Sequence, residues 1–567
     1  MRSRRLWLAA FSCVLALPFN ARAQWLLNGS VVCNATNAQT GAVAVPDGAG
    51  GIIVVWVDGR GANKDIYAQR IDNTGHAQWT ANGVAMCAAT GDQITPVAVS
   101  DGSGGVIAAW ADYRGGATTD IYVQRLNGAG APQWTANGVA LSTATDNQLL
   151  PAIISNGSGG AVVTWEDYRN YGLNFRDVYA ARVTSTGVVS DPLGIVVSAA
   201  ANDQVFPALS PFGTGGAVIV WQDFRTPVTN ADIYATRVSG GGTVLDVVGL
   251  GICKNSAVQS YPTTVADGSG GAIMIWSDYR QVEGIYAQRI NSTGGALWTG
   301  GGVIVSTTLS GPYLLAPRAW GDGAGGATVA WTSAAGADYQ LYSQRIDGNG
   351  TPQWTPFEVV VSNAPFSQMN SAMIPDGAGG FIHAWMDDRS AQDVFDIYAQ
   401  RMSASGEAQW SEDGIVVCNA AQDQSFPAIV SDGAGGGVIA WTDSRAAANG
   451  SQDDVYALRV LASGGIATPV QPAMPSAAFS VRPPEPNPFS HTTTIALEMG
   501  GRGDVTVEVF DVAGVRVRTL TDYNASPSRR VTFDGRDDSG RNLPTGLYFA
   551  RVTALGSTQT VKMVLLR

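Results

Sequence analysis

Acidic, basic and aromatic side chains recur along this chain in the pattern W-x-D-x-R, often with a second carboxylate shortly after it. The first copy, WVDGRGANKDIYAQR, places Asp58 and Arg60 before Asp65. Two carboxylates facing each other across a hairpin would repel, and a calcium ion between them would relieve that repulsion. The arginine is a competing partner, because its guanidinium pairs with a carboxylate through two hydrogen bonds. The pattern therefore allows either a metal site or an ion pair.

The number of copies favours the ion pair. An active site is normally one asymmetric constellation, whereas an element copied through a repeat array shapes each unit. The sixth copy departs, with Ser333 and Ala335 in place of the acid and the base. We predict structural loop clamps, no catalytic residue and no bound metal at the other seven copies. These clamps are Asp58 with Arg60, Asp112 with Arg114, Asp167 with Arg169, Asp223 with Arg225, Asp278 with Arg280, Asp387 with Arg389, and Asp443 with Arg445.

Calcium is the alternative where the carboxylates are doubled. The pairs that suggest it are Asp58 with Asp65, Asp112 with Asp120, and Asp223 with Asp232. The spacing varies between copies, and no copy resembles the D-x-[DN]-x-[DN]-G calcium loop. We therefore predict no cofactor, with calcium kept as the open alternative.

The elements that carry the pattern repeat eight times, at intervals of about 55 residues, up to about residue 470. Each copy contains a glycine-rich turn such as DGAGG, an apolar run ending in Trp, a strand of the DIYAQR type, and a GVxV strand. Glycines supply the positive φ angles of tight turns. Four short strands per unit without a helical period are typical of a β-propeller blade. We therefore predict an all-β fold whose main domain, residues 24–470, is an eight-bladed propeller.

The two ends of the repeat region complement one another. The eighth copy stops near the place where the other copies continue into Gln-Trp, and the segment QWLLNGSVVCNA, which supplies that piece, lies at residues 24–35. Closing the ring with this segment would leave no sheet edge unpaired at the joint. We predict that residues 24 to about 34 complete the last blade.

The loop between W-x-D-x-R and the Tyr strand varies most between copies, and it should share a face of the ring with the DQxxP loop. Variable loops on a rigid scaffold are the expected place for recognition. We predict a ligand-binding patch in the long loop of the third copy, against the plain alternative of a tolerated insertion. The patch consists of Tyr168, Tyr171, Asn174, Phe175 and Arg176.

Signals for an enzyme are sparse. The three His residues have no metal spacing, and no G-x-S-x-G, P-loop or Cys-x-x-Cys motif is present. A glycosidase needs two carboxylates whose pairing depends on the fold, so the sequence leaves this class open. The leading interpretation is a non-catalytic binding protein for an extracellular glycan or protein. The alternatives are a secreted carbohydrate-active enzyme (glycosidase or lyase) on the same scaffold and a purely structural envelope protein.

Four cysteines share one position of the repeat. Cys33, Cys87, Cys253 and Cys418 occupy it, and the other copies hold Ser142, Ser198, Ser306 and Ser362 there. Equivalent positions on radiating blades lie farther apart than the roughly 7 Å between Cα atoms that a disulfide allows. We predict free thiols in a slot for small side chains.

The N-terminus and the net charge bear on location and partners. Residues 1–23 have a basic start, an apolar run and an Ala-x-Ala end, which is the pattern of a secretory signal peptide. No later segment offers about 18 uninterrupted apolar residues, so we predict no transmembrane segment in the mature chain. A net charge of -12 argues against nucleic acid as a partner.

After a proline-rich linker at residues 471–486, short alternating strands predict a small immunoglobulin-like sandwich over 487–567. This stretch resembles the C-terminal sorting domain of type IX secretion substrates and the similar FlgD-like Ig domain. The matching residues are Asn487, Pro488, Phe489, Asp511, Gly514, Asp534, Gly535, Gly546, Tyr548 and Lys562. Phe510 and Phe533 stand where Tyr and Trp are usual. The resemblance implies an interaction with the secretion machinery and a bacterial protein that is released or displayed at the outer-membrane surface. The FlgD-like interpretation would make the domain an adhesive module.

Overall fold

The structure is a computed structural model. It describes residues 25–226, 230–307, 317–335, 338–354, 358–391, 394–446, 452–467, 479–499, 503–512, 514–525, 528–554 and 557–567. Two compact units divide the chain, residues 1–468 and 469–567. The predicted signal peptide and the first part of the predicted linker lie outside the described residues.

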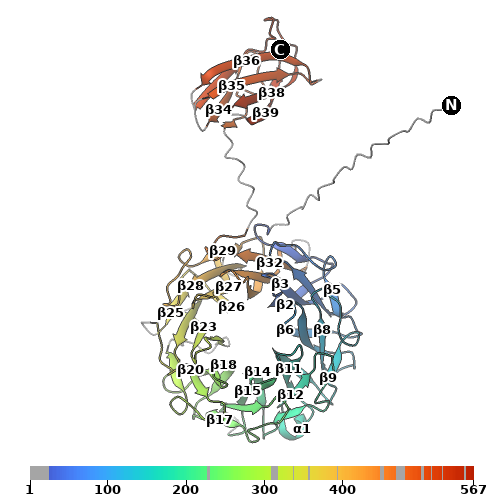
Figure 1. Cartoon of the computed structure of the whole chain (residues 1–567), viewed down its shortest axis with the longest axis vertical. Coiled ribbons are helices and arrows are strands. Elements are labelled where there is room, and N and C mark those ends of the chain that lie inside the picture. Colours follow the sequence, from blue (N-terminus) through green and yellow to red (C-terminus); the bar gives the residue numbers. More distant parts are fainter. Residues whose placement is uncertain are drawn as a thin grey trace, which may run out of the picture. The chain divides into compact units, whose positions relative to one another are not determined.

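The first unit is built from eight antiparallel sheets of four strands each, as an eight-bladed propeller requires (Figure 1). The innermost strands are β2 (Gln39–Pro46), β6 (Gln93–Ser100), β10 (Gln148–Ser155), β14 (Gln204–Phe212), β18 (Gln259–Ala266), β22 (Arg318–Gly321), β26 (Gln368–Pro375) and β30 (Gln424–Ser431). The second strands are β3 (Ile52–Asp58), β7 (Val106–Asp112), β11 (Ala161–Asp167), β15 (Gly216–Asp223), β19 (Ala272–Asp278), β23 (Ala327–Ala335), β27 (Phe381–Ala391) and β31 (Gly437–Asp443).

The outer half of each blade carries the Tyr strand and a short edge strand. The third strands are β4 (Asp65–Ile71), β8 (Asp120–Leu126), β12 (Asp177–Val183), β16 (Asp232–Val238), β20 (Gly284–Ile290), β24 (Asp338–Ile346), β28 (Val394–Met402) and β32 (Asp454–Val460). The edge strands are β5 (Val84–Cys87), β9 (Val139–Ser142), β13 (Ile195–Ser198), β17 (Leu250–Cys253), β21 (Val303–Ser306), β25 (Val359–Ser362), β29 (Ile415–Cys418) and, for the eighth blade, β1 (Ser30–Cys33).

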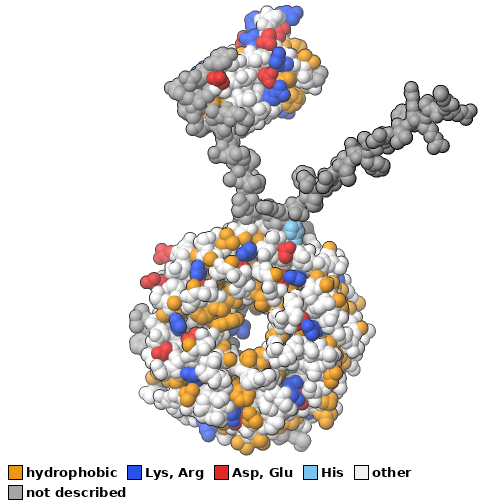
Figure 2. Space-filling view, viewed as in Figure 1, with side chains coloured by type: hydrophobic (Ala, Val, Ile, Leu, Met, Phe, Trp, Pro, Cys, Tyr) orange, Lys and Arg blue, Asp and Glu red, His pale blue; other side chains and the backbone are white. Residues whose placement is uncertain are grey.

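The N-terminal segment joins the two ends of the ring. β1 pairs antiparallel with β32, with Ser30 opposite Ala457. Trp25 donates its indole N–H to the carbonyl of Asn73 at 3.2 Å, just as Trp79 donates to Gly128 one blade further on. Each innermost strand contacts that of the next blade, and β30 contacts β2. The ring therefore closes, and Figure 2 shows an opening at its centre with hydrophobic side chains around it.

Side chains packed between neighbouring blades form the core. All seven positions of β3 are buried, as expected for a strand covered on both faces. Trp56 is fully buried and stacks on Tyr67 of β4 with ring centroids 6.4 Å apart. In the DGAGG turn, Asp47 accepts backbone N–H groups from Ala49 and Gly51 at 2.7 and 2.8 Å. These contacts explain why the blade repeats Trp, Tyr and the glycine-rich turn.

The innermost strands share a bulge with an unusual backbone. In β14 the pairing register shifts between Val205 and Ala208, and Phe206 lies in the left-handed region with φ 53°. A bulky residue rarely adopts this conformation, because its Cβ crowds the backbone. The equivalent left-handed residues of the other described bulges are Gly41, Thr95, Leu150, Tyr261, Asn370 and Phe426. The bulge therefore holds one residue of each of these strands in the left-handed region, and all of them except Gly41 carry a side chain that makes this conformation strained.

The second unit is a small sandwich of two sheets, in the order β33-β34-β37 and β36-β35-β38-β39. Its strands are β33 (Phe479–Val481), β34 (Thr493–Met499), β35 (Gly503–Phe510), β36 (Arg516–Ala525), β37 (Ser528–Phe533), β38 (Gly546–Ala554) and β39 (Ser557–Leu565). β33 lies within the stretch predicted as linker, because its three residues are too few to show an alternating pattern among the prolines. Among the described residues, no helix is long and apolar enough to cross a membrane.

Candidate functional site

The W-x-D-x-R motif forms a fully hydrogen-bonded clamp. Asp58 is buried and accepts from the Trp56 indole at 2.7 Å and from Arg60 through its backbone N–H, Nε and Nη2 at 2.9, 2.8 and 2.6 Å. The guanidinium of Arg60 lies 4.0 Å from the ring centroid of Tyr67. The other six predicted clamps make the same Trp–Asp and Asp–Arg contacts. Each clamp carboxylate is therefore already engaged by a tryptophan and an arginine.

The cysteine and serine slot belongs to the same clamp. Arg60 Nη2 lies 3.2 Å from the sulfur of Cys33 on the edge strand of the preceding blade, and Arg169 donates to Ser142 Oγ at the same distance. Cys33 and its three equivalents are buried free thiols, as predicted. Burial raises the pKa of Cys33 to about 12, which makes the thiol unreactive. The slot therefore ties adjacent blades together.

The second carboxylates face the first across the hairpin, as the calcium alternative requires. Asp65 pairs in register with Asp58, and five other blades repeat this arrangement. Burial, followed by the charge of Asp58, raises the pKa of Asp65 to about 6. Within the described residues, no three His, Cys, Asp or Glu side chains gather as a metal site would need. The clamp arginine already neutralises the first carboxylate of each acidic pair. Calcium binding at these pairs stays an alternative prediction.

The predicted patch in the third blade is an exposed aromatic surface. The loop contains the short helix α1 (Tyr171–Asn174), and the ring centroids of Tyr168 and Tyr171 lie 5.5 Å apart. Phe175 packs edge-on against Tyr171 at 5.9 Å. Tyr171 and Phe175 are 52% and 46% exposed. The side chain of Asn174 lies outside the described residues.

Arg176 anchors this patch to the fourth blade. Its Nη2 pairs with Asp203 at 2.7 Å, its backbone N–H donates to the same carboxylate at 3.1 Å, and its Nη1 lies 3.4 Å from Glu166. Burial tends to raise the pKa of Asp203, but the hydrogen bonds from Arg176 lower it overall. Asp203 belongs to the DQxxP loop, so this loop and the variable loop lie side by side, as the sequence predicts.

Sequence reasoning missed Glu166. Its carboxylate is 1% exposed and accepts the backbone N–H of the bulge residue Phe206 at 2.8 Å. Burial raises the pKa of Glu166. The sequence did contain a signal for this residue. Glu166 stands at the first x position of W-x-D-x-R, where no other copy has an acid. The other copies hold Val57, Ala111, Gln222, Ser277, Thr332, Met386 and Thr442.

Glu166 thus joins Arg176 of the patch to the backbone of Phe206, the bulge residue of the fourth blade. Phe206 is 38% exposed, and its ring centroid lies 5.1 Å from that of Tyr261. We call Tyr168, Tyr171, Phe175, Phe206 and Tyr261 together the aromatic face. It is absent from the repeat consensus, since it depends on residues that differ from blade to blade.

The sorting-domain residues hold the end of the sandwich together. Asn487 donates to the carbonyl of Lys562 at 2.9 Å and accepts from the N–H of Val564 at 2.8 Å. Tyr548 donates its hydroxyl to Pro544 at 2.8 Å. Gly535 and Gly514 adopt left-handed φ angles of 65° and 79°. These contacts fix β39 against the start of the domain.

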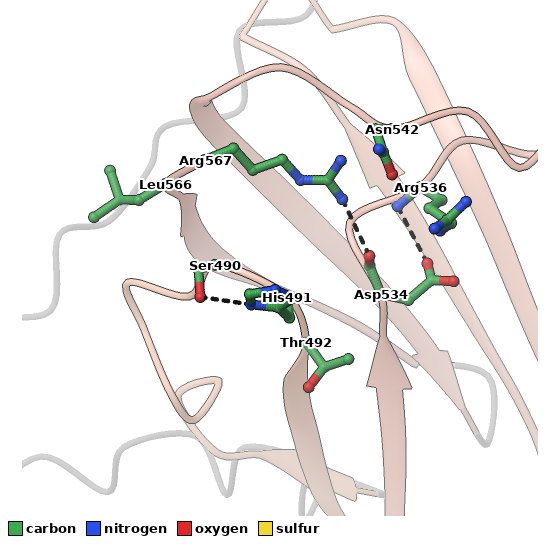
Figure 3. Close-up of a pocket in the computed structure, with 8 residues that line it drawn as sticks. All are labelled: Ser490, His491, Thr492, Asp534, Arg536, Asn542, Leu566 and Arg567. Atoms are coloured by element: carbon green, nitrogen blue, oxygen red, sulfur yellow. Dashed lines mark hydrogen bonds between the residues drawn. The ribbon is translucent and has the colours of Figure 1, made fainter.

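A shallow polar pocket lies at the chain end of this sandwich (Figure 3). The guanidinium of Arg567 reaches the carbonyl of Gly535 at 3.0 Å, and the backbone N–H of Arg536 donates to the Asp534 carboxylate at 3.1 Å. Ser490 and His491 contact each other at 2.9 Å on the opposite side of the pocket. The pocket therefore carries both positively and negatively charged side chains.

Solved structures similar to this chain include β-propeller proteins. An α-L-arabinanase of Penicillium chrysogenum complexed with arabinobiose is 13% identical, with a TM-score of 0.34 over 57% of this chain and 98% of that one. PorZ, a surface component of the type IX secretion system of Porphyromonas gingivalis, is 12% identical, with a TM-score of 0.32 over 94% and 75%. Dipeptidyl peptidase 4 of the same organism is 8% identical, with a TM-score of 0.43 over 83% and 65%. At these scores the likenesses carry no argument about activity.

Comparison with curated proteins gives no match. The family model "Secretion system C-terminal sorting domain" matches residues 486–566, the region whose motif residues the sequence singles out. That family implies contact with the type IX secretion machinery. Residues 486–566 are thus a secretion system C-terminal sorting domain, which marks this propeller protein for secretion to the cell surface or the outside.

Proposed function

We propose that the exported propeller is a non-catalytic recognition protein that binds an extracellular glycan or protein through the aromatic face. The observation that carries this proposal is the exposure of Tyr171 and Phe175, whose rings pack against each other at the surface. Exposed aromatic rings bury a large area at little entropic cost when they meet a partner, which is why they dominate binding hot spots.

The rigidity of this surface supports the proposal. Arg176 pairs with Asp203 and Glu166, and Glu166 holds the backbone of Phe206. A preorganised surface loses little conformational freedom when it binds. A tolerated insertion would not need a buried acid to hold it. The strain at Phe206 and Tyr261 is also of the kind that clusters at functional positions.

The same geometry disfavours a glycosidase at this surface. A glycosidase needs two carboxyl groups that face the scissile bond. Here Glu166 is buried beneath the surface, and both Glu166 and Asp203 contact Arg176. The acids of the aromatic face are therefore suited to positioning side chains.

The test is a glycan and protein array probed with residues 24–567, with and without calcium. We expect specific signals that a Tyr171→Ala/Phe175→Ala variant loses at least tenfold. The matched control is Val247→Ala/Val248→Ala, which removes two apolar side chains that are 80% and 79% exposed elsewhere on the propeller. Equal signals from the wild type and the aromatic variant would overturn the proposal.

A further inference from the structure

A second candidate site lies in the central opening of the ring. A cavity of about 510 Å³ is lined by residues of β2, β18, β22, β26 and β30. These are the innermost strands of five blades, and such strands meet only around the propeller axis. The cavity is therefore a part of the central channel (Figure 2).

Among the described residues that line this cavity, Arg318 of β22 is the charged one. Its register partner Ala330 directly precedes the blade tryptophan, Trp331, which identifies the equivalent residue in each other blade. Those equivalents are Val43, Val97, Ala152, Ala208, Thr263, Ala372 and Ala428. Small side chains therefore occupy this position in the other seven blades, whereas the sixth blade has an arginine.

Arg318 has no partner within the part of the chain that the structure describes. Every clamp arginine and every turn arginine of the type of Arg70 makes an ion pair, whereas Arg318 makes none with a residue that the structure describes. Its side chain is accessible from the channel, yet protein surrounds it, and the loss of hydration lowers the pKa of its guanidinium. A guanidinium in such a place gains from an anion that replaces the lost water.

The residues that line the cavity indicate which class of anion would fit beside Arg318. Thr263, Asn370 and Ser371 offer hydroxyl and amide groups, and Trp320, which is 44% exposed, offers a flat apolar face. A guanidinium forms two hydrogen bonds with a carboxylate or with a phosphate, but its single positive charge balances one carboxylate and leaves a phosphate dianion with net negative charge. The volume is within the range of small-molecule sites.

We propose that the central channel binds a carboxylate-bearing sugar of one or two residues, with its carboxylate paired to Arg318. The hydroxyl and amide groups of the wall receive the sugar hydroxyls, and the ring of Trp320 covers one face. This site uses none of the residues of the aromatic face, so either proposal stands without the other.

Isothermal titration calorimetry on residues 24–567 tests this site with D-galacturonate, D-galactose and D-galactose 6-phosphate. We expect galacturonate to bind at least tenfold more tightly than galactose and more tightly than the phosphate. Arg318→Val should abolish that preference while keeping the melting temperature, because Val43 and Val97 show that valine fits this position. Arg541→Gln, at an exposed arginine of the sandwich, controls for net charge.

Three results would overturn the proposal. The first is galacturonate binding no more tightly than galactose. The second is an Arg318→Val variant that keeps its melting temperature and also its affinity for galacturonate. The third is tighter binding of the phosphate than of the carboxylate.

Discussion

At the scale of single residues, a blade that lacks a conserved side chain of the repeat shows what that side chain contributes in the other blades. The sixth blade has Ser333 where the others have the clamp aspartate, and within the described residues the indole N–H of Trp331 is buried without a hydrogen-bond partner. A buried donor without a partner costs about 1–3 kcal/mol. The sixth blade therefore lacks an acceptor for its tryptophan, and substitution at the clamp positions can supply one.

Restoring the clamp should stabilise the propeller. We expect Ser333→Asp/Ala335→Arg to raise the free energy of unfolding by about 1–2 kcal/mol, because the indole gains an acceptor whose charge is neutralised. Chemical denaturation measures the change. Ser333→Asp without the arginine is the control, and it should destabilise because it buries an unpaired carboxylate. A double variant no more stable than the wild type would contradict this account of the clamp.

His383 is a second buried side chain whose polar atoms lack hydrogen-bond partners among the described residues. It is fully buried, neither ring nitrogen has a hydrogen-bond partner within the described residues, and burial lowers its pKa to about 4. The folded state therefore keeps His383 neutral. The unfolded chain takes up a proton below about pH 6.5, so this residue costs stability as the pH falls from about 6.5 towards 4.

We expect His383→Ile to raise the melting temperature at pH 7.5 and to raise it further at pH 4.5. Isoleucine occupies the equivalent positions 219 and 439, so the side chain fits. Melting curves at the two pH values measure the difference. A gain that is equal at both pH values, or smaller at pH 4.5, would show that the imidazole is not held neutral in the fold.

At the scale of elements, the β3–β4 hairpin carries two carboxylates in one register pair, and its pH dependence runs the other way. Asp65 has its pKa raised to about 6, above the ordinary value of 3.8, so the folded state holds this proton more tightly than the unfolded chain does. The stability that this group contributes is complete below about pH 4 and is lost as the pH rises through 6.

Asp65→Asn should therefore raise the melting temperature at pH 7.5 and change it little at pH 4. Glycine already stands at the equivalent place in the fifth blade, where Asp278 faces Gly284, so the hairpin does not require the acid. Glu412→Gln, at an exposed acid, is the control. A larger effect at pH 4 than at pH 7.5 would contradict the raised pKa.

The blade strands could be predicted from the sequence because their signals are local and repeated. The turn glycines, the Trp–Tyr pair and the W-x-D-x-R clamp each lie within one copy. The contacts that sequence reasoning missed cross from one blade to the next, as between Arg60 and Cys33 or between Glu166 and Phe206. Spacing within a copy cannot show which side chains meet between copies, so the role of Glu166 required the fold.

At the scale of the whole molecule, the chain combines a closed ring with a separate export domain. The sorting domain has its own core, which includes Phe489, Phe533 and Met563. We expect a chain ending at residue 468 to fold into the propeller and to be absent from the outer surface, as fractionation and surface labelling would measure. Surface display of the shortened chain at the wild-type level would contradict the sorting role.

The central claim is that the repeated residues hold the ring and the residues that break the repeat recognise the ligand. One experiment sets the two classes against each other, by measuring the melting temperature and the array signal of Asp112→Asn and of Tyr171→Ala/Phe175→Ala. We predict that Asp112→Asn melts lower but keeps the array signal below its melting temperature, because a clamp has lost its charge. The aromatic variant should keep its melting temperature and lose the signal. Loss of the signal in the folded clamp variant, with the aromatic variant binding as the wild type does, would contradict the claim.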